Sequence, residues 1–163
     1  MRHSVVPYRD STPLRDARAQ YFREHGFGED GGYGRRWVRL KLGPVLLWFP
    51  NTRGRVRAVR LHDLHHIATG YTTTPVGEAE IGAWELASGC GDYLAAWVLN
   101  LGAVAIGLLV APGRVWRAFA RGRRSQSLYR LGLDERWLDD TVGALRPRLG
   151  LGRQAAVSPP HQA

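Results

Sequence analysis

The segment His62-Asp63-Leu64-His65-His66 contains the residues of this sequence best suited to do chemistry. On a helix His62 and His66 are four residues apart and therefore lie on one face. Asp63 is three residues before His66, and at about 100° per residue these three side chains span about 100° of arc, so they can converge on one point. Neutral imidazoles and a carboxylate are ligands of divalent metals such as zinc or iron. The spacing therefore predicts a metal site that contains His62, Asp63 and His66.

Glu78 is the candidate fourth ligand. It follows the tight connection formed by residues 69–77 and begins the next predicted helix. If that helix packs antiparallel on the first, Glu78 reaches the face that carries His62 and His66. Because Glu78 comes from a separate helix, we interpret it as the labile ligand or proton shuttle, and so as the catalytic residue. Histidines on a helix are also common as ordinary surface or core residues, so a role without metal is the alternative.

Three neighbouring polar residues are left outside the predicted ligand set. We expect His65 to point to another side of its helix, where it either supports the ligands from behind or is exposed. Glu80 and Glu85 are interpreted as ordinary polar groups of the following helix. Glu85 is a remote candidate ligand because it lies seven residues beyond Glu78.

The rest of the chain predicts a mainly α fold: a helical domain with a short N-terminal β-hairpin. Partly alternating residues in Trp37–Leu42 and Val45–Phe49, joined by Gly43-Pro44, predict the hairpin. Apolar periodicity and capping residues predict helices at residues 13–26 after a Thr12 cap, 55–69 between an Asn51 cap and Gly70, 77–89, 93–112, 114–121 and 133–149. We expect residues 1–150 to form one domain and residues 151–163 a disordered tail.

Residues 93–112 form an uncharged segment in which Asn100 is the one strongly polar residue. About 20 apolar residues is the length of a membrane-spanning helix, so a span is one interpretation. We favour a buried or membrane-docked helix, since a span would leave little chain on either side for a core.

Basic residues flank this apolar segment, in a chain whose formal net charge is +9. Residues 31–62 contain eight basic groups and residues 113–130 contain six, and neither range contains an acid. An apolar segment beside arginine clusters indicates anionic lipid rather than nucleic acid, and nucleic-acid-binding motifs are absent. We therefore expect a membrane surface as a partner, with Arg121, Arg123 and Arg124 binding anionic headgroups.

The single cysteine, Cys90, excludes an internal disulfide and a multi-cysteine zinc site. Residues 1–10 lack the apolar run of a signal peptide. We expect a peripheral protein on the cytoplasmic side of the inner membrane.

The motif His62-Asp63-x-x-His66, followed after eleven residues by Glu78, resembles the HDxxH-x11-E signature of the coenzyme Q biosynthesis protein 4 family. The sequences GRRSQSLYRLGLDERW and LRPRLGL resemble the C-terminal pattern of that family, so the resemblance covers residues 56–151. The glycine-rich loop and the hairpin before this range do not match it. The chain therefore resembles a divergent bacterial member.

The resemblance implies a helical, membrane-associated protein that binds a divalent cation through His62, Asp63, His66 and Glu78 and acts on prenylated quinone precursors, in ring decarboxylation or hydroxylation. A prenyl tail would need a lipid-binding groove, which we expect from the apolar residues at helical spacing: Leu94, Val98, Leu101, Ala105 and Leu109. Burial of this stripe in the core is the alternative.

Two other functions stay open at this point. A non-catalytic scaffold would bind prenyl lipid, organise other quinone-biosynthesis enzymes and use the metal only to join two helices. A metal-dependent phosphohydrolase of the HD type would need a further histidine and aspartate, for which His25 and Asp92 are poor candidates. An exposed apolar helix in a small protein also makes a homodimer plausible.

Overall fold

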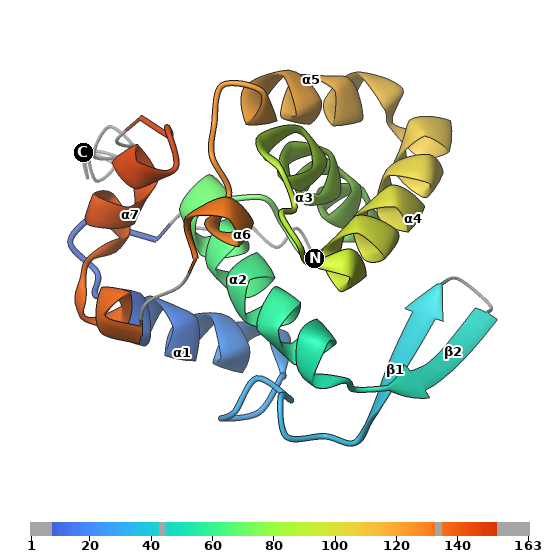
Figure 1. The fold of residues 1–163 in the computed structure, drawn as a ribbon, viewed down its shortest axis with the longest axis horizontal. Helices are drawn as coiled ribbons and strands as arrows, with labels where there is room; N and C mark the ends of the chain where they lie inside the picture. The colour runs from blue at the N-terminus through green and yellow to red at the C-terminus, as the bar shows by residue number, and fades with distance from the viewer. Residues whose placement is uncertain (1–7, 43–44, 133–134, 153–163) are drawn as a thin grey trace, which may run out of the picture.

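A computed structural model of the chain describes residues 8–42, 45–132 and 135–152 (Figure 1). The predicted fold class is confirmed: helices dominate, and one antiparallel hairpin precedes most of them. The elements are α1 Leu14–His25, β1 Trp37–Leu42, β2 Val45–Pro50, α2 Arg53–Thr69, α3 Pro75–Ser88, α4 Leu94–Val110, α5 Pro112–Gly122, α6 Leu128–Leu131, the 3-10 helix η1 Glu135–Asp139, and α7 Val142–Arg148.

The hairpin has the predicted strands, with Trp37 opposite Pro50 and Leu42 opposite Val45. Figure 1 shows it projecting from one side of the helical body, joined to α2 through a short connection. The predicted turn residues 43–44 lie outside the described residues.

Helix α2, which carries the histidine motif, begins and ends on specific capping interactions. The side chain of Thr52 accepts a hydrogen bond from the N–H of Arg55, 3.2 Å away, and so caps the first turn. The predicted cap at Asn51 is wrong, because the Asn51 side chain instead bonds the guanidinium of Arg55 and the carbonyl of Arg35. Gly70, at a φ of 78°, ends the helix in the left-handed conformation, as predicted.

The helix predicted over residues 133–149 is wrong. Two short elements, η1 and α7, stand there, because the chain between them pairs with the segment before α1. The N–H of Leu14 donates to the carbonyl of Asp140 at 2.8 Å, and the N–H of Val142 donates to that of Thr12 at 2.9 Å. These long-range bonds hold the backbone extended where a continuous helix would need it coiled. The predicted cap at Thr12 is wrong: α1 begins at Leu14, Pro13 is at its N-cap, and no side chain caps the first turn.

The main core lies between α1, α2, α6 and α7, and includes Leu14, Tyr21, Leu64, Ile67 and Leu145. Arg146 of α7 is buried beside it and donates to the carbonyl of Ala68 at the end of α2, 3.1 Å away, and to the carboxylate of Asp10. These bonds satisfy the buried guanidinium and join the N-terminal segment, α2 and α7.

The packed structure extends past the predicted domain end at residue 150. Leu151 is buried, and its N–H donates to the carbonyl of Arg146 at 2.8 Å. The predicted disordered tail therefore starts too early, since residue 151 belongs to the core. Residues 153–163 of that predicted tail lie outside the described residues.

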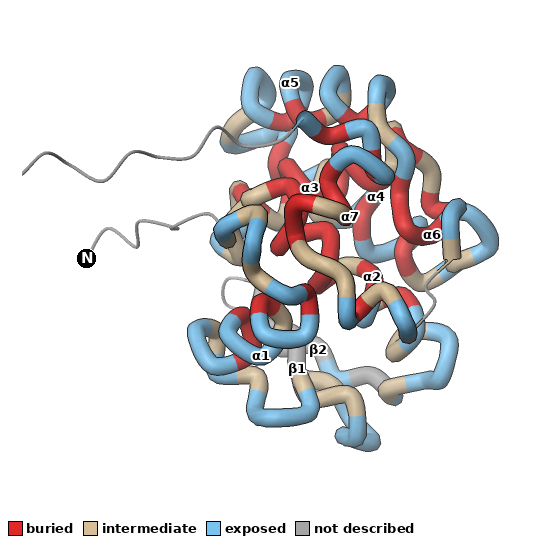
Figure 2. The backbone as a smooth tube through the Cα atoms, turned by 90° about the vertical axis from the view of Figure 1, so that its left-hand side faces the viewer, coloured by how far each residue is buried: buried red, intermediate tan, exposed pale blue. Residues whose placement is uncertain are grey.

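Helix α3 is covered by α4 and α5 on the side away from the main core (Figures 1 and 2). Small residues allow a very close approach there: a Cβ added to Gly107 of α4 would lie 2.2 Å from the Cβ of Ala79 of α3. Ala79, Ala83, Val115 and Ala118 form a small second core at this junction.

Helix α4 turns most of its apolar side chains outward. Of its 17 residues, Ala96, Asn100 and Gly107 are buried. The predicted stripe is exposed along its whole length, with Leu94 74% and Leu109 86% accessible, so its burial in the core is excluded. Among the described residues, none of the helices combines the length and apolarity needed to cross a membrane.

The close contact at Gly107 gives a test of how α4 is held. We expect Gly107→Val to destabilise the protein by about 1–3 kcal/mol, because the new side chain overlaps Ala79. Gly102→Ala, on the same helix but facing open space, should instead stabilise it by about 0.5–1 kcal/mol. Urea unfolding measures both. Equal stability of the two variants would contradict this packing.

Candidate metal centre

The connection between α2 and α3 places Glu78 beside the histidines. Helix α3 begins at Pro75, two residues earlier than predicted, after a Thr74 cap whose side chain accepts from the N–H of Gly77. A Cβ on Gly77 would lie 2.1 Å from the carbonyl oxygen of Thr72, so glycine permits this tight first turn. Glu78 comes next in the chain, and the helix then runs across α2.

Three predicted ligands converge as the sequence indicated: His62, His66 and Glu78. The two imidazole Nε2 atoms are 3.1 Å apart. Nε2 of His62 lies 3.3 Å from one oxygen of Glu78, and Nε2 of His66 lies 3.4 Å from the other. Tetrahedral bonds of the length found in zinc sites give ligand separations of about 3.3 Å. The residues present therefore fit a divalent metal ion.

Hydrogen bonding defines which nitrogen His66 turns toward this centre. Its Nδ1 lies 2.9 Å from the carbonyl oxygen of Tyr71, which can only accept, so Nδ1 carries the proton. Its Nε2 lone pair then faces the Nε2 of His62. Two lone pairs this close repel each other unless a proton or a metal ion lies between them.

The electrostatics of the cluster favour a positive charge. Burial lowers the pKa of His62, but the carboxylates of Glu85 and Glu78 outweigh it and raise this pKa well above its ordinary value. Burial raises the pKa of Glu78, but the interactions with His62 and His66 outweigh that effect and hold the pKa well below its usual range. Glu78 is therefore a carboxylate, and in the absence of metal its charge and that of Glu85 favour a proton on His62.

Asp63 is not among the three residues whose ligand atoms come together. Its carboxylate accepts a hydrogen bond from the Tyr33 hydroxyl at 2.5 Å, and burial raises its pKa although Tyr33 opposes the rise. Tyr33 belongs to the glycine-rich loop before the hairpin, a long-range partner that the helical spacing does not reveal. The expected convergence of Asp63 with the histidines is not present in this arrangement, and its role as a ligand stays a prediction.

His65 and Glu85 extend the hydrogen-bonded cluster beyond the predicted ligands. Both are fully buried, and Nδ1 of His65 lies 2.6 Å from Oε1 of Glu85. The same oxygen lies 2.9 Å from Nδ1 of His62. Exposure of His65, one of the two expected alternatives, is wrong. The available signal was the seven-residue spacing from Glu78 to Glu85, which puts both carboxylates on one face of α3.

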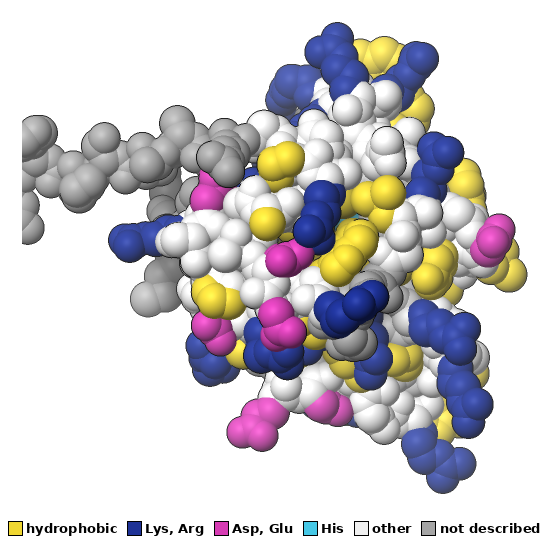
Figure 3. Space-filling model, turned by 60° about the vertical axis from the view of Figure 1, so that its left-hand side comes forward, with side chains coloured by type: hydrophobic (Ala, Val, Ile, Leu, Met, Phe, Trp, Pro, Cys, Tyr) yellow, Lys and Arg dark blue, Asp and Glu magenta, His cyan; other side chains and the backbone are white. Residues whose placement is uncertain are grey.

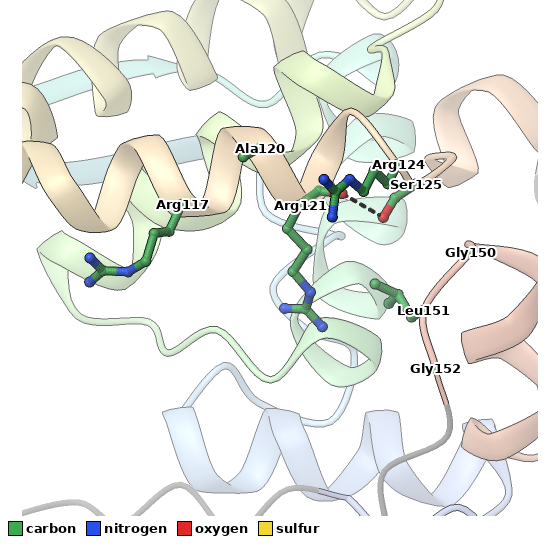
Figure 4. A pocket seen from close by; sticks show the side chains of 8 residues that line it. All are labelled: Arg117, Ala120, Arg121, Arg124, Ser125, Gly150, Leu151 and Gly152. Atoms are coloured by element: carbon green, nitrogen blue, oxygen red, sulfur yellow. Dashed lines mark hydrogen bonds between the residues drawn. The ribbon is translucent and has the colours of Figure 1, made fainter.

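The predicted headgroup residues separate into two groups. Arg121 and Arg124 line an open pocket of about 450 Å³ together with Arg117, and Arg123 is not among its lining residues (Figure 4). No acid lines this pocket within the described part of the chain. Figure 3 shows Lys and Arg side chains along the upper edge of the molecule, where Figure 1 places α5, with hydrophobic side chains between them.

The extra residues that an HD-type phosphohydrolase would need are not at the centre. His25 bonds the carbonyl of Tyr21 through Nδ1 at 2.8 Å, and Asp92 is exposed. Among the described residues, neither belongs to the group that could hold a metal.

Comparisons of the chain with known protein families, with curated proteins and with solved structures gave no match. The chemistry of the site is therefore the basis for inferring a function for this chain. Two imidazoles and one carboxylate leave coordination positions free for water or substrate, which is typical of catalytic rather than structural zinc sites.

The raised pKa of His62 predicts that metal and proton compete. Below that pKa, zinc affinity should rise about tenfold per pH unit, because binding requires the neutral imidazole, and it should level off above it. In the metal-free protein, the attraction between protonated His62 and the carboxylates of Glu85 and Glu78 should be fully stabilising below about pH 6.5, the ordinary pKa of histidine. This contribution should be lost as pH rises through the pKa of His62 in the folded protein. Calorimetric zinc titrations in buffers of different ionisation enthalpy should report about one proton released. An affinity independent of pH would contradict the assignment.

Proposed function

We propose that the chain is a metal-dependent protein of ubiquinone or prenyl-quinone biosynthesis that acts on a membrane-borne prenylated aromatic precursor, in decarboxylation or hydroxylation of the ring. The observation that carries this proposal is the convergence of His62, His66 and Glu78 on one point. It adds to the spacing of these residues, which resembles the coenzyme Q biosynthesis protein 4 signature.

A divalent ion at this centre would supply Lewis acidity toward a ring oxygen or carboxylate of the substrate, and iron would in addition supply redox chemistry. His62 and His66 would hold the ion through Nε2. The Glu78 side chain is 39% exposed, so it lies at the accessible side of the cluster. Its lowered pKa keeps it ionised, which favours the role of labile ligand over that of proton donor.

The substrate class and the location are supported by the surface of α4 and α5. The stripe Leu94, Val98, Leu101, Ala105 and Leu109 is exposed and apolar. The arginine-lined pocket lies between α5, the next helix in the chain, and residues 150–152. A protein that carries both an exposed apolar helix and exposed cationic groups suits the interfacial region of an anionic bilayer. We place the protein peripherally on the cytoplasmic side of the inner membrane, where other quinone-biosynthesis enzymes or a second copy of the chain are its expected partners.

Metal content and turnover test the proposal together. We expect one zinc or iron ion per chain, and loss of the ion in His66→Ala and Glu78→Ala variants that keep their helicity. With a prenylated hydroxybenzoate labelled at the ring carboxyl group, the loaded protein should release labelled carbon dioxide, and the variants should not. A bound metal without turnover would overturn the catalytic proposal in favour of a lipid-binding scaffold. Absence of metal after reconstitution would overturn both the metal centre and the catalysis.

Membrane docking is tested separately with vesicles. We expect binding to vesicles that contain phosphatidylglycerol, and weaker binding to phosphatidylcholine alone. Leu109→Glu should weaken binding about 10–150-fold, because burial of a leucine side chain in lipid contributes about 1.5–3 kcal/mol. Leu131→Glu is the matched control, since Leu131 is exposed on α6 rather than on α4. Cosedimentation that is equal for both variants would contradict docking through α4.

A further inference from the structure

The carboxylate of Glu85 is fully buried and has hydrogen-bonding groups on every side. Oε1 faces Nδ1 of His62 at 2.9 Å and Nδ1 of His65 at 2.6 Å. Oε2 accepts from the amide of Asn100 at 2.6 Å and from the hydroxyl of Tyr129 at 3.1 Å. Four groups from α2, α4 and α6 therefore surround one acceptor that has no contact with solvent.

The tautomer of His65 follows from its other nitrogen. Nε2 of His65 accepts the backbone N–H of Leu128 at 2.8 Å, so this nitrogen carries a lone pair. The proton of a neutral His65 must then be on Nδ1, which donates to Glu85. His65 thus links the backbone of α6 to this carboxylate and fixes its orientation.

The same reasoning applies to His62. An ionised carboxylate only accepts, so Nδ1 of His62 at 2.9 Å from Oε1 must carry a proton. A neutral His62 with its proton on Nδ1 has its lone pair on Nε2, the atom that lies 3.1 Å from Nε2 of His66. His66 is held in the same tautomer by a different acceptor, the carbonyl of Tyr71.

We propose that Glu85 is a positioning residue of the metal centre, which holds His62 in the Nδ1–H tautomer so that Nε2 is the metal-binding nitrogen. This inference rests on the proposed metal site. Glu85 itself contacts neither the ion nor the substrate. Glu85 acts through His62, and His65 in turn orients Glu85.

Glu85→Gln tests this role because glutamine has nearly the shape of glutamate, but only one end of its side-chain amide accepts hydrogen bonds. If its amide nitrogen faces the histidines, it donates to Nδ1 of His62 and forces the proton onto Nε2, which blocks the centre. If its oxygen faces them, its nitrogen meets the donor amide of Asn100. In this second orientation the amide oxygen still accepts from His62, but a neutral amide is a weaker acceptor than a carboxylate, so the Nδ1–H signal of His62 shifts and the protein loses stability.

The experiment is a zinc titration combined with ¹⁵N NMR of the histidine side chains in the zinc-loaded full-length chain. In the parent protein we expect zinc on Nε2 of His62 and of His66, with a hydrogen-bonded proton on each Nδ1. In Glu85→Gln we expect a zinc dissociation constant about 10–100-fold higher. The Nδ1–H signal of His62 should be lost or shifted while that of His66 persists, because His66 bonds Tyr71 instead.

Two further variants serve as controls. Glu80→Gln neutralises another carboxylate of α3, one that pairs with Arg114, and should leave zinc affinity and both histidine signals unchanged. Tyr129→Phe removes one hydrogen bond from Glu85 but none from His62, so it should lower stability while the His62 signal stays in place.

The possible results decide between the proposals. Zinc on Nδ1 of His62 in the parent protein would overturn the role of Glu85 without any variant, even if Glu85→Gln does not fold. Tight zinc binding and an unchanged His62 signal in Glu85→Gln would also overturn it, and leave the metal site intact. Failure of the parent protein to bind zinc or iron would overturn the metal site and this inference with it.

Discussion

The buried carboxylate of Glu85 is the constraint on which the arrangement of the helices depends. A charge without solvent contact must be matched by donors, and here these donors come from α2, α4 and α6. Removing one partner of a buried ionic network costs about 3–5 kcal/mol, because the remaining charge stays unmatched. Each of the three helices is therefore fixed relative to α3 by a polar contact, in addition to apolar packing that tolerates small displacements.

Helix α3 lies between the candidate metal centre on one side and helices α4 and α5 on the other. Glu78 and Glu85 face the histidines of α2, whereas Ala79 and Ala83 face α4 and α5. The small side chains on the second side let α4 approach until Gly107 contacts Ala79. Because this narrow contact buries little of α4, its larger apolar residues stay on the outside. The two faces of this one helix thus account for both the candidate metal centre and the exposed apolar face of α4.

The helical motif alone describes this candidate metal centre incompletely. The motif places His62 and His66 on the same helical face and does not distinguish their roles. In the fold, however, the buried carboxylate of Glu85 orients His62, whereas the backbone carbonyl of Tyr71 orients His66. The motif residue Asp63 is engaged by Tyr33 from a loop thirty residues earlier in the chain. The groups that orient these candidate ligands come from distant parts of the sequence, and they decide which atoms face the centre of the cluster.

The sequence by itself determined the fold class, the hairpin, the end of α2 at Gly70 and the pairing of His62 and His66 on one helical face. These features depend on backbone preferences and on periodicity within a few residues. Tertiary structure decided that residues 133–149 do not form one helix, since the chain there pairs with the segment before α1. It also decided that the α4 stripe faces outward and that Glu85 is enclosed. Periodicity shows which residues share a face of a helix, but the neighbour that covers that face is selected by contacts between residues far apart in the chain.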